Sequence, residues 1–168
     1  MQGIGAVTMR SVAVAAGMTA PALYWHYQDK DALLRDIRRE VGALYRNYVF
    51  DGLQEESGLS GLRRVLAAFR SFALAQPHFY EMLFLLPPVP GSSVRPSAMS
   101  QILVDRVREC MRQDALQEGD PVDVALTITA HAQGMVMLYR RGQFDSPEDF
   151  TAFFDRSVDR LLTGIVLR

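Results

Sequence analysis

Four consecutive ring-bearing side chains, Tyr24, Trp25, His26 and Tyr27, offer hydroxyl, indole and imidazole groups within about one helical turn. A helix that buries one face spaces its large residues three and four apart and keeps its other face polar. Four adjacent rings point all round such a helix, so some of them must meet a surface other than the protein's own interior. Lys30, the only lysine of the chain, follows shortly after them.

These groups are suited to the oxygens of phosphate. Tyr24 and His26 can donate hydrogen bonds to a nucleic-acid backbone, and such contacts set the register of binding rather than its sequence. The Lys30 ammonium, next to the N–H groups of a helix start, faces the same kind of anion. Residues 1–50 carry a net charge of +2 and residues 51–168 a net charge of −3, which agrees with an anionic partner at the N-terminal end. We expect the neighbouring Arg38 and Arg39 on a solvated helix face, the alternative being a second DNA contact.

No set of residues has the spacing of an enzyme active site. The sequence contains no nucleophile paired with a base, no glycine-rich phosphate loop and no paired acids, so we expect no catalytic residues. The remaining enzyme hypothesis would place Cys110 or Tyr80 in a catalytic pocket. The histidines and the single cysteine are scattered along the chain, and we expect no metal site and no cofactor.

The composition is that of a globular protein, with 168 residues, 49% of them hydrophobic and 22% charged. This length suffices for one core and a small appended domain. No apolar run reaches the ~18 residues of a membrane span, and no basic and apolar leader begins the chain, so we expect no membrane association. The lone cysteine indicates a reducing cytoplasm.

Caps, prolines and helical spacing predict an all-α fold. Expected helices cover residues 9–16 (cap Thr8), a short segment after Thr19, 29–51, a segment capped by Ser60 and ending before Pro77, 77–86, 97–118, 121–142 (cap Asp120) and 147–166 (cap Ser146). Asp51-Gly52 closes the third helix, and EESGLSG follows as a linker. We expect two domains, 1–50 and 52–168.

The first two helices have the dimensions of a helix-turn-helix, with Gly17 at the turn. Val12, Ala13 and Ala16 are expected to form the inner face of the first helix, and Leu23 that of the second. The second helix is suited to the major groove of DNA, which admits an α-helix and exposes base edges.

The stretch TMRSVAVAAGMTAPALYWHYQDKDALL resembles the DNA-binding end of the TetR (tetracycline repressor-like) transcriptional regulators. The pattern of that family is met at Thr8, Arg10, Ala13, Gly17, Leu23, Tyr24, His26, Lys30, Leu33 and Leu34. The resemblance implies a helix-turn-helix head joined to a C-terminal helical bundle. It also implies a transcriptional repressor that a small molecule releases from its DNA operator.

Carried over residue by residue, the resemblance implies a DNA-binding set of Thr8, Arg10, Thr19, Ala20, Pro21, Ala22, Tyr24, Trp25, His26, Tyr27 and Lys30. Arg10 would reach a guanine edge or a phosphate. Ala20 and Ala22 stand where relatives often carry hydrogen-bonding side chains, and an alanine only touches a thymine methyl group. Because each missing bidentate pair forfeits about 1–3 kcal/mol of base discrimination, we expect Arg10 to provide most of the direct readout, and methyl contacts and DNA shape the rest.

Members of the family carry one more helix before this motif, whereas only MQGIGAV precedes Thr8. We expect that the start of the chain has been lost. The alternative is a ligand-binding and dimerisation protein without DNA-binding activity, owing to the absent first helix.

The last two expected helices are apolar around an arc wider than one core requires, which predicts a homodimer through a four-helix bundle. Paired heads then meet the two half-sites of a palindromic double-stranded operator. The segment ITAHAQGMVMLYRRGQF resembles the C-terminal signature of one TetR subgroup.

A small-molecule pocket is expected in the C-terminal domain, where adaptable, aromatic and polar side chains are available. The expected ligand-binding residues are Phe69, Phe72, Tyr80, Met82, Arg106, His131, Met135 and Tyr139. The alternative is that these residues are simply core.

Overall fold

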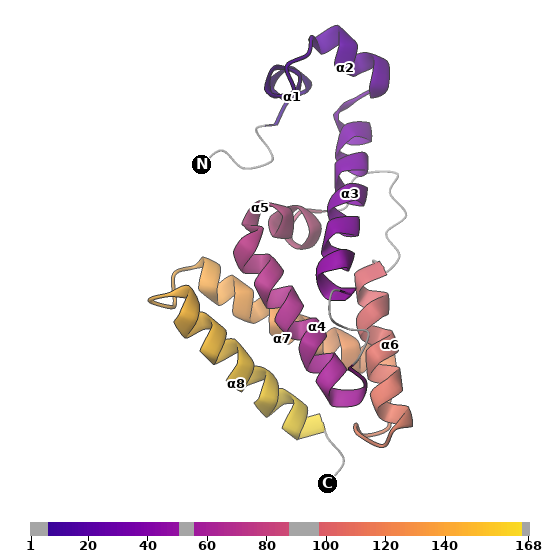
Figure 1. The fold of residues 1–168 in the computed structure, drawn as a ribbon, viewed down its shortest axis with the longest axis vertical. Helices are drawn as coiled ribbons and strands as arrows, with labels where there is room; N and C mark the ends of the chain where they lie inside the picture. The colour runs from indigo at the N-terminus through magenta and orange to yellow at the C-terminus, as the bar shows by residue number, and fades with distance from the viewer. Residues whose placement is uncertain (1–6, 51–55, 88–97, 166–168) are drawn as a thin grey trace. The chain divides into compact units, whose positions relative to one another are not determined.

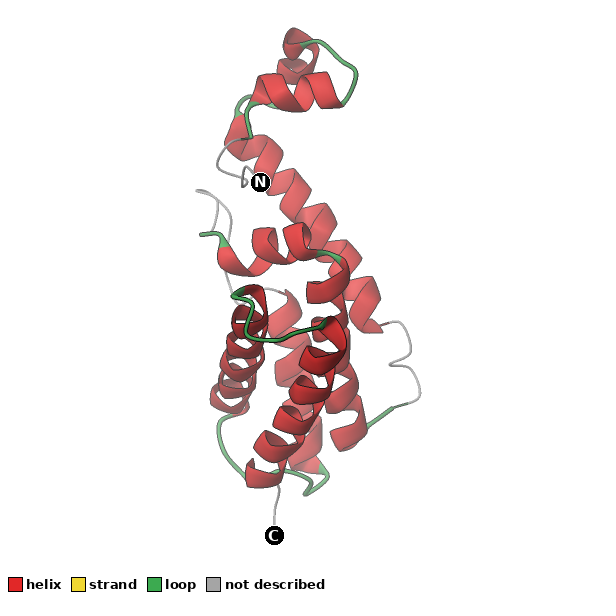
Figure 2. Ribbon diagram, turned by 90° about the vertical axis from the view of Figure 1, so that its left-hand side faces the viewer, coloured by secondary structure: helices red, strands yellow, loops and turns green. Residues whose placement is uncertain are grey.

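The computed structural model describes residues 7–50, 56–87 and 98–165, and every regular element in these ranges is helical (Figure 2). Figure 1 labels the elements along the chain. They are α1 (Met9–Ala15), α2 (Ala20–His26), α3 (Lys30–Phe50), α4 (Gly58–Ala75), α5 (Pro77–Tyr80), the π-helical turn η2 (Glu81–Leu85), α6 (Ala98–Arg112), α7 (Pro121–Arg140) and α8 (Pro147–Ile165). The all-α prediction is confirmed.

The two short N-terminal helices begin at the predicted caps. The Ser11 backbone N–H donates to Thr8 Oγ1 at 3.1 Å and the Thr8 N–H donates to Ser11 Oγ at 3.0 Å, which closes a capping box at α1. Thr19 Oγ1 accepts from the Ala22 N–H at 3.3 Å and caps α2. Gly17 between them has a φ of +66°, which glycine adopts without steric cost. Helices this short do not persist alone, so the caps fix where each begins and tertiary packing must hold it.

That packing is a small apolar core shared by α1, α2 and the start of α3, which together we call the head. Its buried members are Met9, Ala13, Leu23 and Leu33, and Val12, Met18, Ala20, Tyr27 and Ile37 pack around them. Leu23 is the only buried residue of α2. Of the predicted inner face of α1, Ala16 is exposed, because the helix ends at Ala15 and Ala16 already belongs to the turn.

Helix α4 begins earlier than predicted, since its N-cap is Ser57 and not Ser60. Ser60 lies in the first turn, where its hydroxyl donates to the Ser57 backbone oxygen at 2.8 Å. The helix ends at Ala75, before Pro77, as predicted.

The segment PHFYEMLFLL was predicted as one regular helix, and the structure divides it. After α5 the backbone widens into η2, in which the Leu86 N–H donates to the Glu81 oxygen at 3.1 Å. The segment stops at Leu86, because Pro87 and Pro88 have no N–H to continue a helix.

Helix α6 is shorter than the predicted 97–118. It ends at Arg112, and the Ala115 N–H donates back to the Cys110 oxygen at 2.9 Å. Asp114 in this turn has a φ of +53°, a conformation that commonly ends helices. The chain then buries Leu116. The predicted start at residue 97 lies outside the described residues.

Helices α7 and α8 start at the predicted caps. Asp120 Oδ1 accepts from the Val122 N–H at 2.8 Å, and Ser146 Oγ accepts from the Asp149 N–H at 3.0 Å. With α4 and α6 they supply the larger core, whose most deeply buried side chains include Leu62, Phe72, Val107, Ile128, Val136, Phe150, Phe154 and Leu162.

Contacts along the chain define two compact units. The N-terminal unit comprises Met1–Leu44 and His78–Val94, and the C-terminal unit comprises Tyr45–Pro77 and Arg95–Arg168. The domains 1–50 and 52–168 stay a prediction. Within the N-terminal unit, Arg38 of α3 makes long-range hydrogen bonds to the segment that begins at His78. The expected solvated helix face holds for Arg39, which is exposed, and is wrong for Arg38.

The head should unfold locally when Leu23, the buried residue of α2, is truncated. We expect Leu23→Ala to cost about 2–5 kcal/mol, the range for a truncated buried leucine. Amide hydrogen exchange then accelerates across α1 and α2, while amides of α7 keep their protection. Val14→Ala, at an exposed position of α1, is the control and should change exchange little. Equal acceleration in α2 and α7 would show that the head has no stability of its own.

Candidate nucleic-acid interface and ligand groove

Burial of Leu23 decides which way the ring-bearing residues of α2 face. Leu23 is 4% exposed, whereas the next two residues, Tyr24 and Trp25, are 53% and 90% exposed. His26, the last residue of α2, is also exposed. The structure therefore brings a phenol, an indole and an imidazole together on the outer side of α2, as the sequence predicted.

Tyr27 lies differently from its three neighbours. It is the C-cap residue of α2, its ring packs against the head core, and its hydroxyl donates to Asp36 Oδ2 at 3.3 Å. The predicted DNA-binding set included Tyr27, but its hydroxyl is engaged within the head. Thr8 is similar, because its hydroxyl belongs to the cap of α1.

The start of α2 is small and solvent-facing. Thr19 and Pro21 are exposed, and Ala20 and Ala22 are half-buried. A helix end without long side chains can approach base edges closely, and methyl groups match the thymine methyl. Arg10 is exposed on α1, and Lys30 is the first residue of α3. Both add positive charge to the same small unit.

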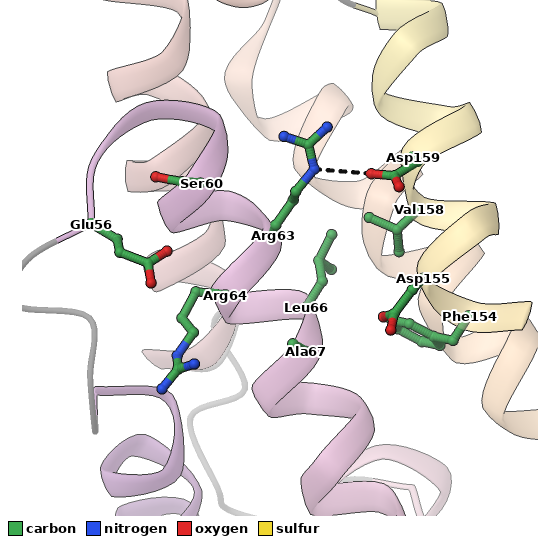
Figure 3. A pocket seen from close by; sticks show the side chains of 10 residues that line it. All are labelled: Glu56, Ser60, Arg63, Arg64, Leu66, Ala67, Phe154, Asp155, Val158 and Asp159. Carbon is green, nitrogen blue, oxygen red and sulfur yellow. Dashed lines mark hydrogen bonds and ion pairs between the residues drawn. The ribbon is translucent and has the colours of Figure 1, made fainter. Parts of the chain in front are cut away.

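The C-terminal unit contains a groove between α4 and α8 with a volume of about 340 Å³ (Figure 3). Its lining combines apolar side chains with charged ones: Glu56, Ser60, Arg63, Arg64, Leu66, Ala67, Phe154, Asp155, Val158 and Asp159. The volume falls in the range of small-molecule sites.

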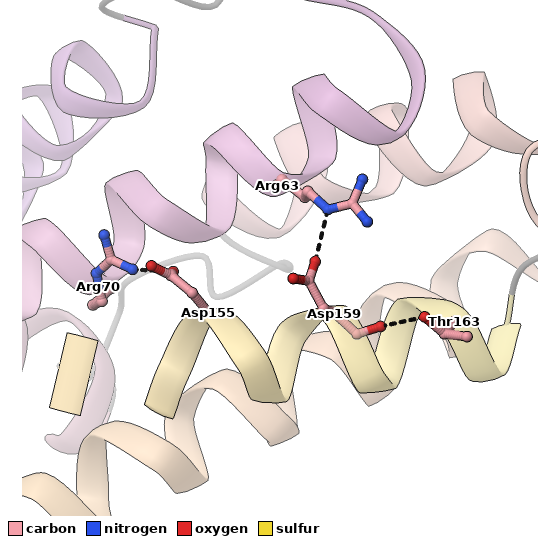
Figure 4. A network of polar contacts seen from close by, with 5 residues as sticks. All are labelled: Arg63, Arg70, Asp155, Asp159 and Thr163. Carbon is pink, nitrogen blue, oxygen red and sulfur yellow. Dashed lines mark hydrogen bonds and ion pairs between the residues drawn. The ribbon is translucent and has the colours of Figure 1, made fainter. Parts of the chain in front are cut away.

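Two arginine–aspartate pairs join α4 and α8 along this groove (Figure 4). Arg63 Nε donates to Asp159 Oδ1 at 3.0 Å, and Arg70 pairs with Asp155. The Arg70 guanidinium also lies 5.6 Å from the centre of the Phe154 ring, a cation–π distance. The groove therefore offers an apolar floor with an ionic rim, which suits an amphipathic molecule.

Two family models match this chain. Residues 1–37 match the family model described as bacterial regulatory proteins of the tetR family, and residues 62–161 match the model of the tetracyclin repressor-like C-terminal domain. The chain belongs to the TetR family. The match to the N-terminal model starts at residue 1 and includes the whole helix-turn-helix, which favours the regulator over the alternative of a protein without DNA-binding activity.

One curated relative and two solved structures are similar to this TetR chain over most of its length. The tetracycline repressor protein class A from transposon 1721 of Escherichia coli is 25% identical over 150 residues, which are 87% of this chain and 63% of that repressor. A protein of unknown function from Rhodococcus sp. RHA1 has a TM-score of 0.77 at 22% identity, covering 98% of this chain and 86% of the other. A TetR family transcription regulator from Marinobacter aquaeolei VT8 has a TM-score of 0.75 at 18% identity, covering 98% and 87%.

The residues predicted for the ligand do not line the groove. Phe69, Phe72 and Met135 are buried in the C-terminal unit, and Tyr139 stacks on Phe150 at 4.6 Å. Tyr80 and Met82 are buried and belong to the N-terminal unit. In this TetR chain the predicted set is thus divided between two units.

The two polar members of that set have partners of their own. Arg106 Nη1 donates to Glu109 Oε2 at 2.7 Å, and His131 Nε2 shares a hydrogen bond with Ser157 Oγ at 3.0 Å. Sequence reasoning missed the groove because its defining contacts join residues of α4 to residues of α8 far along the chain. The signal available was the charged spacing of Arg63 with Arg70 and of Asp155 with Asp159.

The remaining expectations concern the Cys110 thiol, metal sites and membrane-spanning helices. Burial raises the pKa of the Cys110 thiol, and the charge of Glu109 adds to this shift, so the thiol stays protonated and poorly nucleophilic at neutral pH. Within the described residues no group of three or more His, Cys, Asp or Glu side chains could hold a metal ion. In the same ranges no helix is long and apolar enough to cross a membrane.

Tyr24 within α2 and Tyr27 at its C-cap should respond differently to loss of the hydroxyl. We expect Tyr24→Phe to weaken binding to any duplex by about tenfold, the value of one hydrogen bond to a charged group. Tyr27→Phe is the matched control, because its hydroxyl binds Asp36, and it should leave DNA affinity nearly unchanged. Fluorescence anisotropy of a labelled duplex at low salt measures both. The same loss in both variants would remove the distinction between an outward and an inward tyrosine.

Proposed function

We propose that the chain is a dimeric transcriptional repressor that binds a palindromic operator through α2 and is released by a small apolar or amphipathic ligand. The carrying observation is the outward cluster of Tyr24, Trp25 and His26 on a capped helix-turn-helix. A helix held to its unit by one leucine, with donors on its outer side and small residues at its start, fits a major groove flanked by phosphates. Such a protein works where bacterial DNA lies, in the cytoplasm.

The exposed surface of α7 supports a second copy of the chain as the partner. Exposed apolar and small residues follow one another at steps of four along this helix: Val122, Leu126, Ala130, Gly134 and Leu138. Positions four apart lie on one face, so the stripe is continuous. A contiguous exposed apolar strip of this kind marks an interface.

Glycines inside two helices support the same partner. A Cβ added at Gly134 of α7 or at Gly164 of α8 would meet no atom of the described residues within 4 Å. Each glycine costs about 1 kcal/mol relative to alanine in a helix, and no described neighbour accounts for it. Close approach of a helix from a second copy would account for it.

The C-terminal unit supports the proposal that a ligand releases the protein from DNA. The relative from Escherichia coli is named a tetracycline repressor, and the groove between α4 and α8 offers this chain a place for a small amphipathic molecule. A ligand that favours one arrangement of the two heads over the other shifts the population between them. DNA affinity then falls, because two recognition helices must fit half-sites one helical turn or a multiple of it apart. Binding by the eight residues predicted from sequence stays a prediction.

A bulky charged residue at the stripe should break the dimer without harming the subunit. We expect Gly134→Arg to give a folded monomer, since Gly134 is exposed and a Cβ added there meets no described atom within 4 Å. Gly119→Arg, a position that is also open but lies outside the helices, is the matched control and should stay dimeric. Sedimentation equilibrium with circular dichroism measures mass and folding. A dimeric Gly134→Arg variant would contradict this interface.

Operator binding is tested on the promoter region next to the chain's own gene. We expect a discrete complex in a gel-shift experiment that survives an excess of unrelated DNA. Arg10→Ala should lower the preference for that fragment by about tenfold through loss of one base contact, with a smaller change on unrelated duplexes. Equal binding of the promoter fragment and unrelated DNA by the unsubstituted protein would overturn the proposed function.

A further inference from the structure

The two arginine–aspartate pairs of the groove between α4 and α8 differ in how much of each guanidinium they use. The Arg70 side chain is 13% exposed, pairs with Asp155 and lies over the Phe154 ring, so its charge is engaged within the unit. The Arg63 side chain is 47% exposed and hydrogen-bonds to Asp159 through Nε alone. Of the two, Arg63 is therefore the arginine that keeps donors for another molecule.

The remaining edge of the Arg63 guanidinium suits a carboxylate. Nη1 and Nη2 carry the other N–H groups of the fork, and neither nitrogen donates to an atom of the described residues. Figure 3 shows both nitrogens turned away from Asp159. This planar edge matches the two oxygens of a carboxylate, which accept two parallel N–H···O bonds from it. Charge-assisted pairs of this kind are stronger than hydrogen bonds between neutral groups.

The carboxylates of the groove already have cationic neighbours. Asp155 and Asp159 are each paired with an arginine, and Figure 3 shows Glu56 together with Arg64 on the side of α4 away from α8. A cationic ligand has to compete with these arginines, whereas an anionic ligand finds the Nη edge of Arg63. The charge pattern therefore favours an anion.

The size of the groove limits the rest of the ligand. Its volume of about 340 Å³ lies near the lower end of the range of about 300–1,000 Å³ for small-molecule sites. Leu66, Phe154 and Val158 in its lining are at most 5% exposed, so the apolar floor is narrow. The half-buried Ala67 and the aliphatic stem of Arg63 are further apolar surfaces that a ligand can reach. A compact ring fits this space better than an extended hydrocarbon chain.

We propose that the groove binds a small organic carboxylate, whose two oxygens accept hydrogen bonds from Nη1 and Nη2 of Arg63 while a compact ring lies against Ala67. Asp159 keeps its bond to the Arg63 Nε in this complex. The proposal deepens the proposed function, on which its meaning for release from DNA rests, by naming the chemical class of the ligand.

The test measures the binding of three aromatic probes by isothermal titration calorimetry at low salt. Naphthoate carries a carboxylate, naphthamide is its neutral counterpart, and naphthylmethylammonium carries a cation on the same ring system. We expect the parent to bind naphthoate about tenfold or more tightly than either counterpart, the scale of a hydrogen bond to a charged group.

Four variants locate the site, and circular dichroism establishes that each is folded. Arg63→Gln should weaken naphthoate binding about tenfold. Arg63→Gln combined with Asp159→Asn should do the same, because this pair of changes keeps the net charge of the groove and removes the fork. Asp159→Asn alone should tighten naphthoate binding, because it removes a negative charge next to Arg63. Arg160→Gln, at an exposed arginine of α8 outside the lining, is the matched control and should stay within about twofold of the parent.

Three results would overturn the proposal: no naphthoate binding by the parent, equal binding of naphthoate and either counterpart, or unchanged naphthoate binding by the folded Arg63→Gln variant. The same loss in Arg160→Gln as in Arg63→Gln would also overturn it, because the effect would then be one of overall charge. Failure of the proposed function is seen separately, in a gel shift with the promoter fragment. If naphthoate binds as expected but the parent binds no DNA, or keeps its DNA at saturating naphthoate, the repressor or its release fails and the carboxylate site stands.

Discussion

The head depends on the burial of a single leucine. Two helices of seven residues cannot persist in water without tertiary contacts, and Leu23 is the only side chain of α2 that is buried. Leu23, with Ala20 and the C-cap residue Tyr27 beside it, fills the inner side of α2 and leaves Tyr24, Trp25 and His26 exposed. The outward rings are therefore a consequence of how small the core is, and the same constraint frees the whole outer side of α2 for a nucleic acid.

Local chemistry made much of the fold predictable. Thr8, Thr19 and Asp120 cap helices as expected because a side-chain oxygen beside a free N–H acts within a few residues. The end of α6, the π form of η2 and the engagement of Arg38 were not predictable in this way. The last two are linked by hydrogen bonds across more than forty residues of sequence, and no short pattern encodes a partner that far away. The ligand groove escaped prediction for the same reason.

Two features support the proposal of a regulated repressor. The stripe on α7 and the open glycines Gly134 and Gly164 support a second copy of the chain, and in the proposed dimer this copy sets the separation of two heads. The groove between α4 and α8 is the proposed site of an amphipathic ligand, in the same unit as the stripe.

Trp25 is the only tryptophan of the chain and is 90% exposed at the outer side of α2, so its emission reports directly on whether this surface meets DNA. The protein is titrated into a labelled duplex spanning the chain's own promoter, while Trp25 emission per protein and the anisotropy of the duplex are recorded together. The account predicts that the emission changes in step with the anisotropy and that both midpoints move to higher protein concentration as salt rises. Saturating anisotropy with unchanged Trp25 emission would contradict it, because DNA would then be bound by some other surface.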